Sequence, residues 1–124
     1  MLKIKIDTSK LRTWLEVNRS AIKNNYRVFR SLVGPKVKLM AVVKSNAYGH
    51  GLVHFAREMA TPAYRSGRLG VDYIGVDSIV EAVRLREEEI ATPLLVLGYT
   101  RPDNFLQAVA SDVAVAISSF ESLE

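Results

Sequence analysis

Apolar residues along the chain fall into two alternating patterns: short continuous runs, and stretches in which they recur every three or four positions. The runs predict β-strands, and near-continuous apolar character is typical of strands buried on both faces of a parallel sheet. The clearest example is the run at residues 37–43. The five runs that predict strands are residues 13–17, 37–43, 73–76, 94–97 and 113–117.

The stretches between these runs predict one helix after each strand. Their ends carry the expected signals. Asn18 can cap the first helix, and Gly34 followed by Pro35 can end it. Ser78 and Glu81 have the spacing of a capping box, in which the serine oxygen accepts a backbone N–H and the glutamate reaches back. Strands that alternate with single helices predict an α/β fold with a parallel sheet and right-handed crossovers.

Composition narrows the class of protein. The chain has 124 residues, of which 48% are hydrophobic and 24% charged, as in ordinary globular domains. This length suits one domain but is short of the roughly 200 residues of a closed eight-stranded α/β barrel. The absence of cysteine excludes disulfides, thiolate nucleophiles and cysteine-ligated metals. No apolar run approaches the roughly 18 residues of a membrane span, and no signal-peptide pattern is present, so we expect a cytoplasmic protein without membrane contact.

Charge is distributed unevenly. The net charge is +4, with 12 basic and 3 acidic residues in positions 1–62 against 5 basic and 10 acidic in positions 63–124. A basic half can bind nucleic acid or a phosphorylated ligand. Here the basic residues are spread singly and are not interleaved with aromatic residues, so we interpret them as a solvated surface and predict no nucleic-acid partner.

Lys44 is the first candidate for chemistry. It ends a strongly apolar strand, at the edge where parallel α/β folds bind ligands. Desolvation by Val42 and Val43 favours the neutral, nucleophilic amine, which can form a Schiff base with an aldehyde. Gly49 and Gly51 stand at the start of a helix, a position that favours phosphate. This combination suggests pyridoxal phosphate, although on spacing alone a lysine that ends a buried strand is more often a solvent-reaching cap.

A metal site is the alternative chemistry. His50 and His54 are four residues apart and can share one side of a helix, with Glu58 one turn further on. No other third ligand has suitable spacing. We therefore predict no metal, and expect His50 to pack or to hydrogen-bond at the helix start.

Residues 41–51 carry a family resemblance. Their sequence, Ala-Val-Val-Lys-Ser-Asn-Ala-Tyr-Gly-His-Gly, closely resembles the pyridoxal-phosphate attachment motif of the alanine racemases, which are fold-type III enzymes. Further matches lie at residues 13–17, 21–25, 81–86 and 93–98. The resemblance covers essentially this whole chain, but only the N-terminal part of the family's longer chain.

The resemblance implies an architecture and an activity. Residues 1–124 would be a partial N-terminal domain, half of a TIM-type (β/α)8 barrel, while residues 13–17 would pair with the family's second domain. The complete enzyme would be a cytoplasmic homodimer. With pyridoxal 5'-phosphate it would interconvert L- and D-alanine, the latter for peptidoglycan of the cell wall. The 124-residue chain alone is expected to be inactive.

The resemblance also implies residue roles. Lys44 would hold the cofactor as an internal aldimine and then act as the acid–base group on the D-amino acid face, and the Tyr48 hydroxyl would contact the cofactor phosphate. The family's opposite-face tyrosine, donated across the dimer interface, and its two active-site arginines have no matching positions here. Ser45 stands where the family often has Ala or Gly, and Asp77 makes the end of its strand more polar than the common Val-Ala pair.

Two other functions remain open on the sequence. One is a non-catalytic half-barrel that binds pyridoxal phosphate or self-associates, because half a barrel leaves strand edges unpaired. The other is a racemase of the same fold acting on another amino acid, such as serine or lysine.

Overall fold

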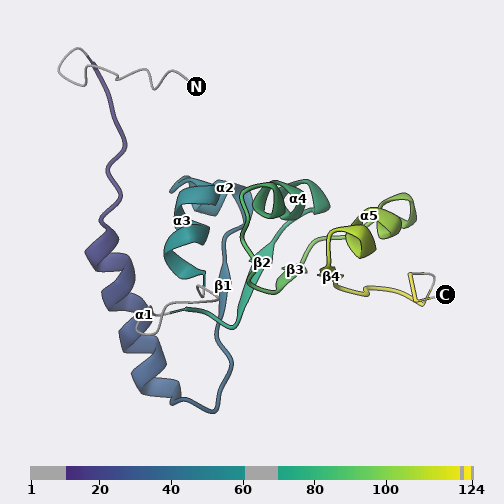
Figure 1. The fold of residues 1–124 in the computed structure, drawn as a ribbon, viewed down its shortest axis with the longest axis horizontal. Coiled ribbons are helices and arrows are strands. Elements are labelled where there is room, and N and C mark those ends of the chain that lie inside the picture. The colour runs from purple at the N-terminus through teal and green to yellow at the C-terminus, as the bar shows by residue number, and fades with distance from the viewer. Residues whose placement is uncertain (1–10, 61–69, 121, 124) are drawn as a thin grey trace.

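The structure is a computed structural model that describes residues 11–60, 70–120 and 122–123. Strands and helices alternate along these residues (Figure 1). In chain order the elements are α1 (Arg19–Val33), β1 (Met40–Val42), α2 (Lys44–Tyr48), α3 (Leu52–Met59), β2 (Tyr73–Val76), α4 (Ile79–Glu87), β3 (Leu94–Val96), η2 (Pro102–Asn104), α5 (Phe105–Ala110) and β4 (Val113–Val115).

The four strands form one parallel sheet in the order β1-β2-β3-β4. Val42 pairs with Gly75, and Val76 pairs with Val96, so the carboxyl ends of neighbouring strands meet at one edge. Helices α3, α4 and α5 succeed one another from the β1 side of the sheet to the β4 side (Figure 1). This arrangement confirms the predicted α/β fold, in which each parallel pair is joined through helical segments.

The core lies between the two central strands and helices α3 and α4. Ile74 and Val76 of β2 are fully buried, as are Val96 of β3 and Leu85 of α4. Burying each such side chain contributes about 1.5–3 kcal/mol relative to leaving it exposed. The central strands therefore anchor the residues that follow them.

The predicted strand at residues 37–43 is shorter than expected and is not buried on both faces. β1 covers Met40–Val42, and Met40 is exposed. Only one neighbour, β2, pairs with β1 in the described sheet, so its other edge is uncovered. In contrast, β2 has neighbours on both sides, and Ile74, Gly75 and Val76 are all buried, as predicted for a parallel strand.

The predicted strand at residues 13–17 is wrong for the described structure. This segment is not a strand, and both Trp14 and Leu15 are largely exposed. Its β-propensity is real, but no described strand lies alongside to receive its backbone hydrogen bonds, and a strand needs such a partner. The Trp14 indole N–H instead donates to the Glu16 carboxylate at 2.8 Å.

The first helix forms as the sequence predicts. The Asn18 side chain accepts a hydrogen bond from Ala21 N at 3.0 Å, and Gly34 ends the helix at a φ of 74°. Tyr26 is buried and donates its hydroxyl to Gly70 O at 2.7 Å. α1 is the longest described helix, with 15 residues, and none of the described helices has the length and apolar character needed to cross a membrane.

Two arginines organise the amino ends of the strands, opposite the edge where Lys44 lies. Arg86 donates hydrogen bonds to the carbonyl oxygens of Ile90 and Thr92 before β3, and to those of Ser111 and Asp112 before β4. Burial lowers the pKa of Arg86. One guanidinium thus satisfies four carbonyls in two loops, which the planar fork of arginine suits better than a lysine ammonium.

Arg30 is the second arginine at this end of the sheet, and it forms an ion pair with Asp72. Its Nη2 atom lies 2.8 Å from Asp72 Oδ2, and the same oxygen accepts a hydrogen bond from Leu39 N at 2.7 Å. The hydrogen bond from the Leu39 backbone, followed by the bond from Arg30, lowers the pKa of Asp72. The charged carboxylate therefore connects the end of α1, the start of β1 and the start of β2.

We expect Arg86→Lys to lower the free energy of unfolding by about 2–4 kcal/mol, because an ammonium cannot reach all four carbonyl oxygens at once. Denaturant unfolding of the purified chain measures this change. Arg84→Lys is the matched control on the same helix, since Arg84 is exposed and forms ion pairs with Glu87 and Glu88. This substitution should change the free energy of unfolding by less than about 0.5 kcal/mol. Equal stabilities of the two variants would contradict the role of Arg86.

The contribution of Asp72 should depend on pH. Because the folded-state pKa lies below the unfolded value, the charged form stabilises the fold at pH values above the unfolded pKa, and this stabilisation is lost as pH falls through the folded pKa. We expect the stability difference between wild type and Asp72→Asn to be constant near neutral pH and to shrink below about pH 4. Unfolding curves of both proteins across this range test it; a difference independent of pH would show that the carboxylate charge is not involved.

Candidate active site

The carboxyl edge of the sheet brings together residues from three consecutive strands. Lys44 follows β1, Asp77 follows β2, and Gly98 follows β3. Backbone pairing continues just past the strands, with Val43 N donating to Gly75 O at 2.8 Å and Leu97 N donating to Val76 O at 2.8 Å. Parallel α/β folds place their ligands at this edge, and the sequence predicted Lys44 there.

The Lys44 amine is accessible. Its side chain is 40% exposed, and Nζ lies 3.9 Å from Asp77 Oδ1. The expected desolvation of the amine by Val42 and Val43 is not seen in the described structure, because the Lys44 side chain stays partly exposed. An exposed ion pair of this length contributes little to stability. It does place an acceptor for a proton or a hydrogen bond beside the amine.

The turn after Lys44 has an unusual backbone. Ser45, Asn46, Ala47 and Tyr48 all have positive φ values, between 52° and 56°. The left-handed conformation costs roughly 1–2 kcal/mol for each residue that carries a Cβ. Consecutive strained residues persist where surrounding contacts determine them, and they cluster at functional sites.

Local contacts support this turn. Ala47 is buried, and its N–H donates to Val43 O at 2.7 Å. The Asn46 side chain accepts a hydrogen bond from Leu52 N at 2.8 Å, which ties the turn to the start of α3. His50 Nδ1 lies 2.9 Å from Ala47 O. The turn is therefore a defined structure that directs its exposed side chains.

Tyr48 ends this turn and is 62% exposed. Within the residues that the structure describes, its hydroxyl has no hydrogen-bond partner. Lys44 and Tyr48 thus share one short element, α2, and both present accessible polar atoms. The structure leaves both side chains available to a ligand.

The Ser78–Glu81 capping box forms only in part. Ser78 Oγ accepts from Glu81 N at 3.4 Å, as predicted. The Glu81 carboxylate, however, accepts a hydrogen bond from Asp77 N at 2.9 Å. It also accepts one at 3.3 Å from Asn46 N, in the turn that follows Lys44. The sequence predicted that this glutamate reaches back but did not reveal the contact with Asn46, since positions 35 residues apart carry no local signal of contact.

Gly98 matters at this edge in a way that the sequence did not indicate. Its N–H donates to Asp77 O at 3.1 Å. A Cβ at this position would lie 2.3 Å from that same oxygen, so no side chain fits without moving the backbone. Glycine thereby lets the end of β3 approach the loop that carries Asp77.

The two histidines do not assemble a metal site in the described part of the chain. The His50 ring packs edge-on against Phe55 with centroids 5.9 Å apart, as expected for a residue that packs at the helix start. Glu58 forms ion pairs with Arg19 and Lys23. Among the described residues, no three potential ligands come close enough to hold a metal.

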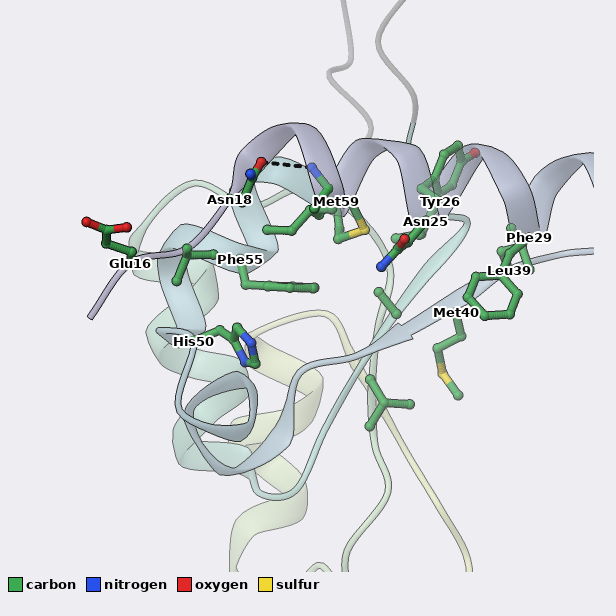
Figure 2. A pocket seen from close by; sticks show the side chains of 16 residues that line it. Glu16, Asn18, Asn25, Tyr26, Phe29, Leu39, Met40, His50, Phe55 and Met59 are labelled. Atoms are coloured by element: carbon green, nitrogen blue, oxygen red, sulfur yellow. Dashed lines mark hydrogen bonds between the residues drawn. The ribbon is translucent and has the colours of Figure 1, made fainter. Parts of the chain in front are cut away.

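A cavity of about 650 Å³ lies beside this site, between α1, β1 and α3 (Figure 2). Its lining is mainly apolar and includes Phe29, Met40, Phe55 and Met59, with His50 at the end nearest α2. Lys44 does not line it. The cavity borders the edge of β1 that carries no strand, so we attribute it to that uncovered edge and not to the lysine chemistry.

Comparison with protein families gives one match that spans most of the chain. Residues 17–124 match the family described as alanine racemase, N-terminal domain. Alanine racemase 2 of Oceanobacillus iheyensis is 40% identical over 112 residues, which are 90% of this chain and 27% of that protein. The alanine racemase of Methanococcus maripaludis is 38% identical over 108 residues, or 87% of this chain and 27% of that protein.

Solved structures agree with these relatives. The alanine racemase from Bacillus anthracis with bound L-Ala-P has a TM-score of 0.73 and 32% identity, and the match covers 85% of this chain and 25% of that one. The alanine racemase from Oenococcus oeni has a TM-score of 0.71 and 30% identity, covering 87% and 29%. This chain therefore spans about a quarter of the length of the relatives that it matches.

We expect Gly98→Ala to destabilise the fold by about 1–3 kcal/mol, because the added Cβ collides with a backbone oxygen and forces two strand ends apart. Gly75→Ala is the matched control, since its Cβ would meet the flexible ends of Leu97 and Met40 at 3.0 and 3.2 Å, which can shift. Urea unfolding of both variants gives the comparison. The assignment would fail if Gly75→Ala were the more damaging substitution.

Proposed function

The chain belongs to the alanine racemase N-terminal domain family, and from this premise we propose that it provides the cofactor-binding lysine of an amino acid racemase that uses pyridoxal 5'-phosphate. The observation that carries the proposal is the position of Lys44, with an accessible amine at the carboxyl edge of the sheet, on the turn that also carries Tyr48. Family membership supports an isomerase, and the local geometry supports the specific residue roles.

The residues at this edge fit pyridoxal phosphate. Lys44 Nζ would form the covalent link to its aldehyde, and the Tyr48 hydroxyl would donate a hydrogen bond to its phosphate. Both groups are exposed on one element. When bound, this cofactor withdraws electrons from the α-carbon of an amino acid and makes the α-proton acidic. The chemistry therefore needs from the protein an amine for attachment and a group to move that proton.

Lys44 would serve both needs. Its free amine would take the α-proton on one face of the substrate. The Asp77 carboxylate, 3.9 Å away, would then attract the protonated amine and favour its position. Inversion also needs a group on the opposite face, and we propose that, as in the family resemblance, a tyrosine from a second copy of the complete protein supplies it.

The same premise fixes the rest of the proposal. The substrate would be L-alanine and the product D-alanine for peptidoglycan, in a cytoplasmic homodimer. Residues 1–124 would form part of the barrel domain of that enzyme. The names of the relatives favour alanine over serine or lysine.

We expect an equimolar amount of pyridoxal phosphate, followed by borohydride reduction, to leave a pyridoxyl group mainly on Lys44. Mass spectrometry of a proteolytic digest locates the label, and Lys44→Ala should abolish that labelled peptide. Lys38→Ala is the control: Lys38 Nζ lies over the Tyr73 ring, next to the opposite end of β1. Label spread evenly over the lysines of the chain would overturn the proposed role of Lys44.

A further inference from the structure

We propose that Glu81 is a positioning residue for Lys44, and that its carboxylate clamps the left-handed turn of α2 to the loop that carries Asp77. This inference rests on the proposed function of Lys44 as the residue that links to the cofactor. It gives the capping-box glutamate a role at the site beyond capping its own helix.

The geometry of the clamp is simple. Glu81 Oε1 accepts a hydrogen bond from Asn46 N at 3.3 Å, and Oε2 accepts one from Asp77 N at 2.9 Å. Asn46 lies two residues after Lys44 on the turn, and the Asp77 side chain lies 3.9 Å from Lys44 Nζ. One carboxylate therefore fixes the spacing between the backbone that bears the amine and the backbone that bears its neighbour. Figure 1 shows α2 and α4 beside each other at this end of the sheet.

The turn needs such a contact because its backbone is strained. The four residues from Ser45 to Tyr48 are all left-handed, at roughly 1–2 kcal/mol each. The other hydrogen bonds that these four residues form in the described structure lie within residues 43–52. Among the described residues, the bond from Asn46 to Glu81 is the hydrogen bond that ties this turn to another part of the chain. Without it, the turn is held by its own local bonds and by the packing of Ala47.

Glu81 is itself well anchored. It lies in the first turn of α4, where its backbone N–H donates to Ser78 Oγ. The neighbouring Ile79 and Ala82 are buried in the core. A side chain on a packed helix holds its partners more accurately than one on a loop. The Glu81 carboxylate therefore connects the turn that follows Lys44 to a helix that is packed into the core.

The chemistry of the clamp requires a carboxylate. Each backbone N–H uses a separate oxygen, and a carboxylate offers two acceptors. Glutamine has the same shape but one acceptor and one NH₂ group, so one backbone N–H would face another donor. Glu81→Gln thus removes one arm of the clamp with almost no change in volume, and the remaining arm shows whether both are needed.

The first experiment uses the cofactor-free chain. Hydrogen exchange measured by mass spectrometry on a peptide covering residues 44–52 should be roughly tenfold faster in Glu81→Gln, because loss of a hydrogen bond to a charged group opens the turn more often. Glu87→Gln, on the same helix but paired with Arg84 in solvent, should match wild type. Denaturant unfolding checks that both variants remain folded. Should Glu81→Gln fail to fold, Glu81→Asp takes its place in the experiment. Aspartate keeps two acceptor oxygens, but its side chain is too short to reach the backbone N–H groups of both Asn46 and Asp77.

The second experiment measures how fast an equimolar amount of pyridoxal phosphate links to Lys44, by borohydride trapping at successive times. We expect Glu81→Gln to slow labelling of Lys44 roughly tenfold while labelling of Lys38 is unchanged, since misplacing a reacting group costs rate. A purely structural role would not separate the two lysines in this way.

The outcomes separate the two proposals. If wild type labels Lys44 selectively and Glu81→Gln matches it in both exchange and labelling, the positioning role is overturned while the proposed function stands. If exchange over residues 44–52 quickens in Glu81→Gln but wild type shows no selective labelling, the clamp exists and the proposed function fails. Faster exchange together with slower labelling supports both.

Discussion

The parallel register of β1, β2 and β3 is the constraint on which the candidate site depends. Val42 lies opposite Gly75 and Val76 lies opposite Val96, so the residue after each strand emerges at the same edge. Strands about 4.8 Å apart cannot separate these residues without breaking backbone hydrogen bonds. The proximity of Lys44 and Asp77 is thus a consequence of strand pairing, and the bare glycine at position 98 brings the third strand end into contact with the second.

A second level of organisation is built on that edge. The backbone from Ser45 to Tyr48 adopts a conformation that isolated residues avoid, and it is held by bonds to its own neighbours and by one carboxylate from α4. The strain is local and the restraint comes from the core. This combination holds the backbone that carries Lys44 and Tyr48 in one conformation while both side chains remain accessible.

Sequence patterns predicted the elements whose burial is decided by nearby residues. The strand at residues 73–76 has the bounds that its apolar run predicts, and Asn18 and Gly34 mark the ends of α1.

The sequence-based predictions were wrong where the structure of a segment depends on residues far away in the chain. Residues 13–17 have strand-like composition but no described neighbour, and β1 is open on one edge. The position of Lys44 followed from its strand, but its exposure did not, because periodicity does not show what covers the end of a sheet. The contact of Glu81 with Asn46 and the close approach at Gly98 arise from tertiary structure alone.

The two ends of the sheet differ in how they contribute to stability. Arg86 and the Arg30–Asp72 pair stabilise loops at the amino ends of the strands, away from the Lys44 edge. Proteins tolerate costly active-site conformations when stability elsewhere exceeds the threshold for folding. A reserve of stability at the amino ends therefore offsets the cost of the left-handed backbone from Ser45 to Tyr48 at the carboxyl edge.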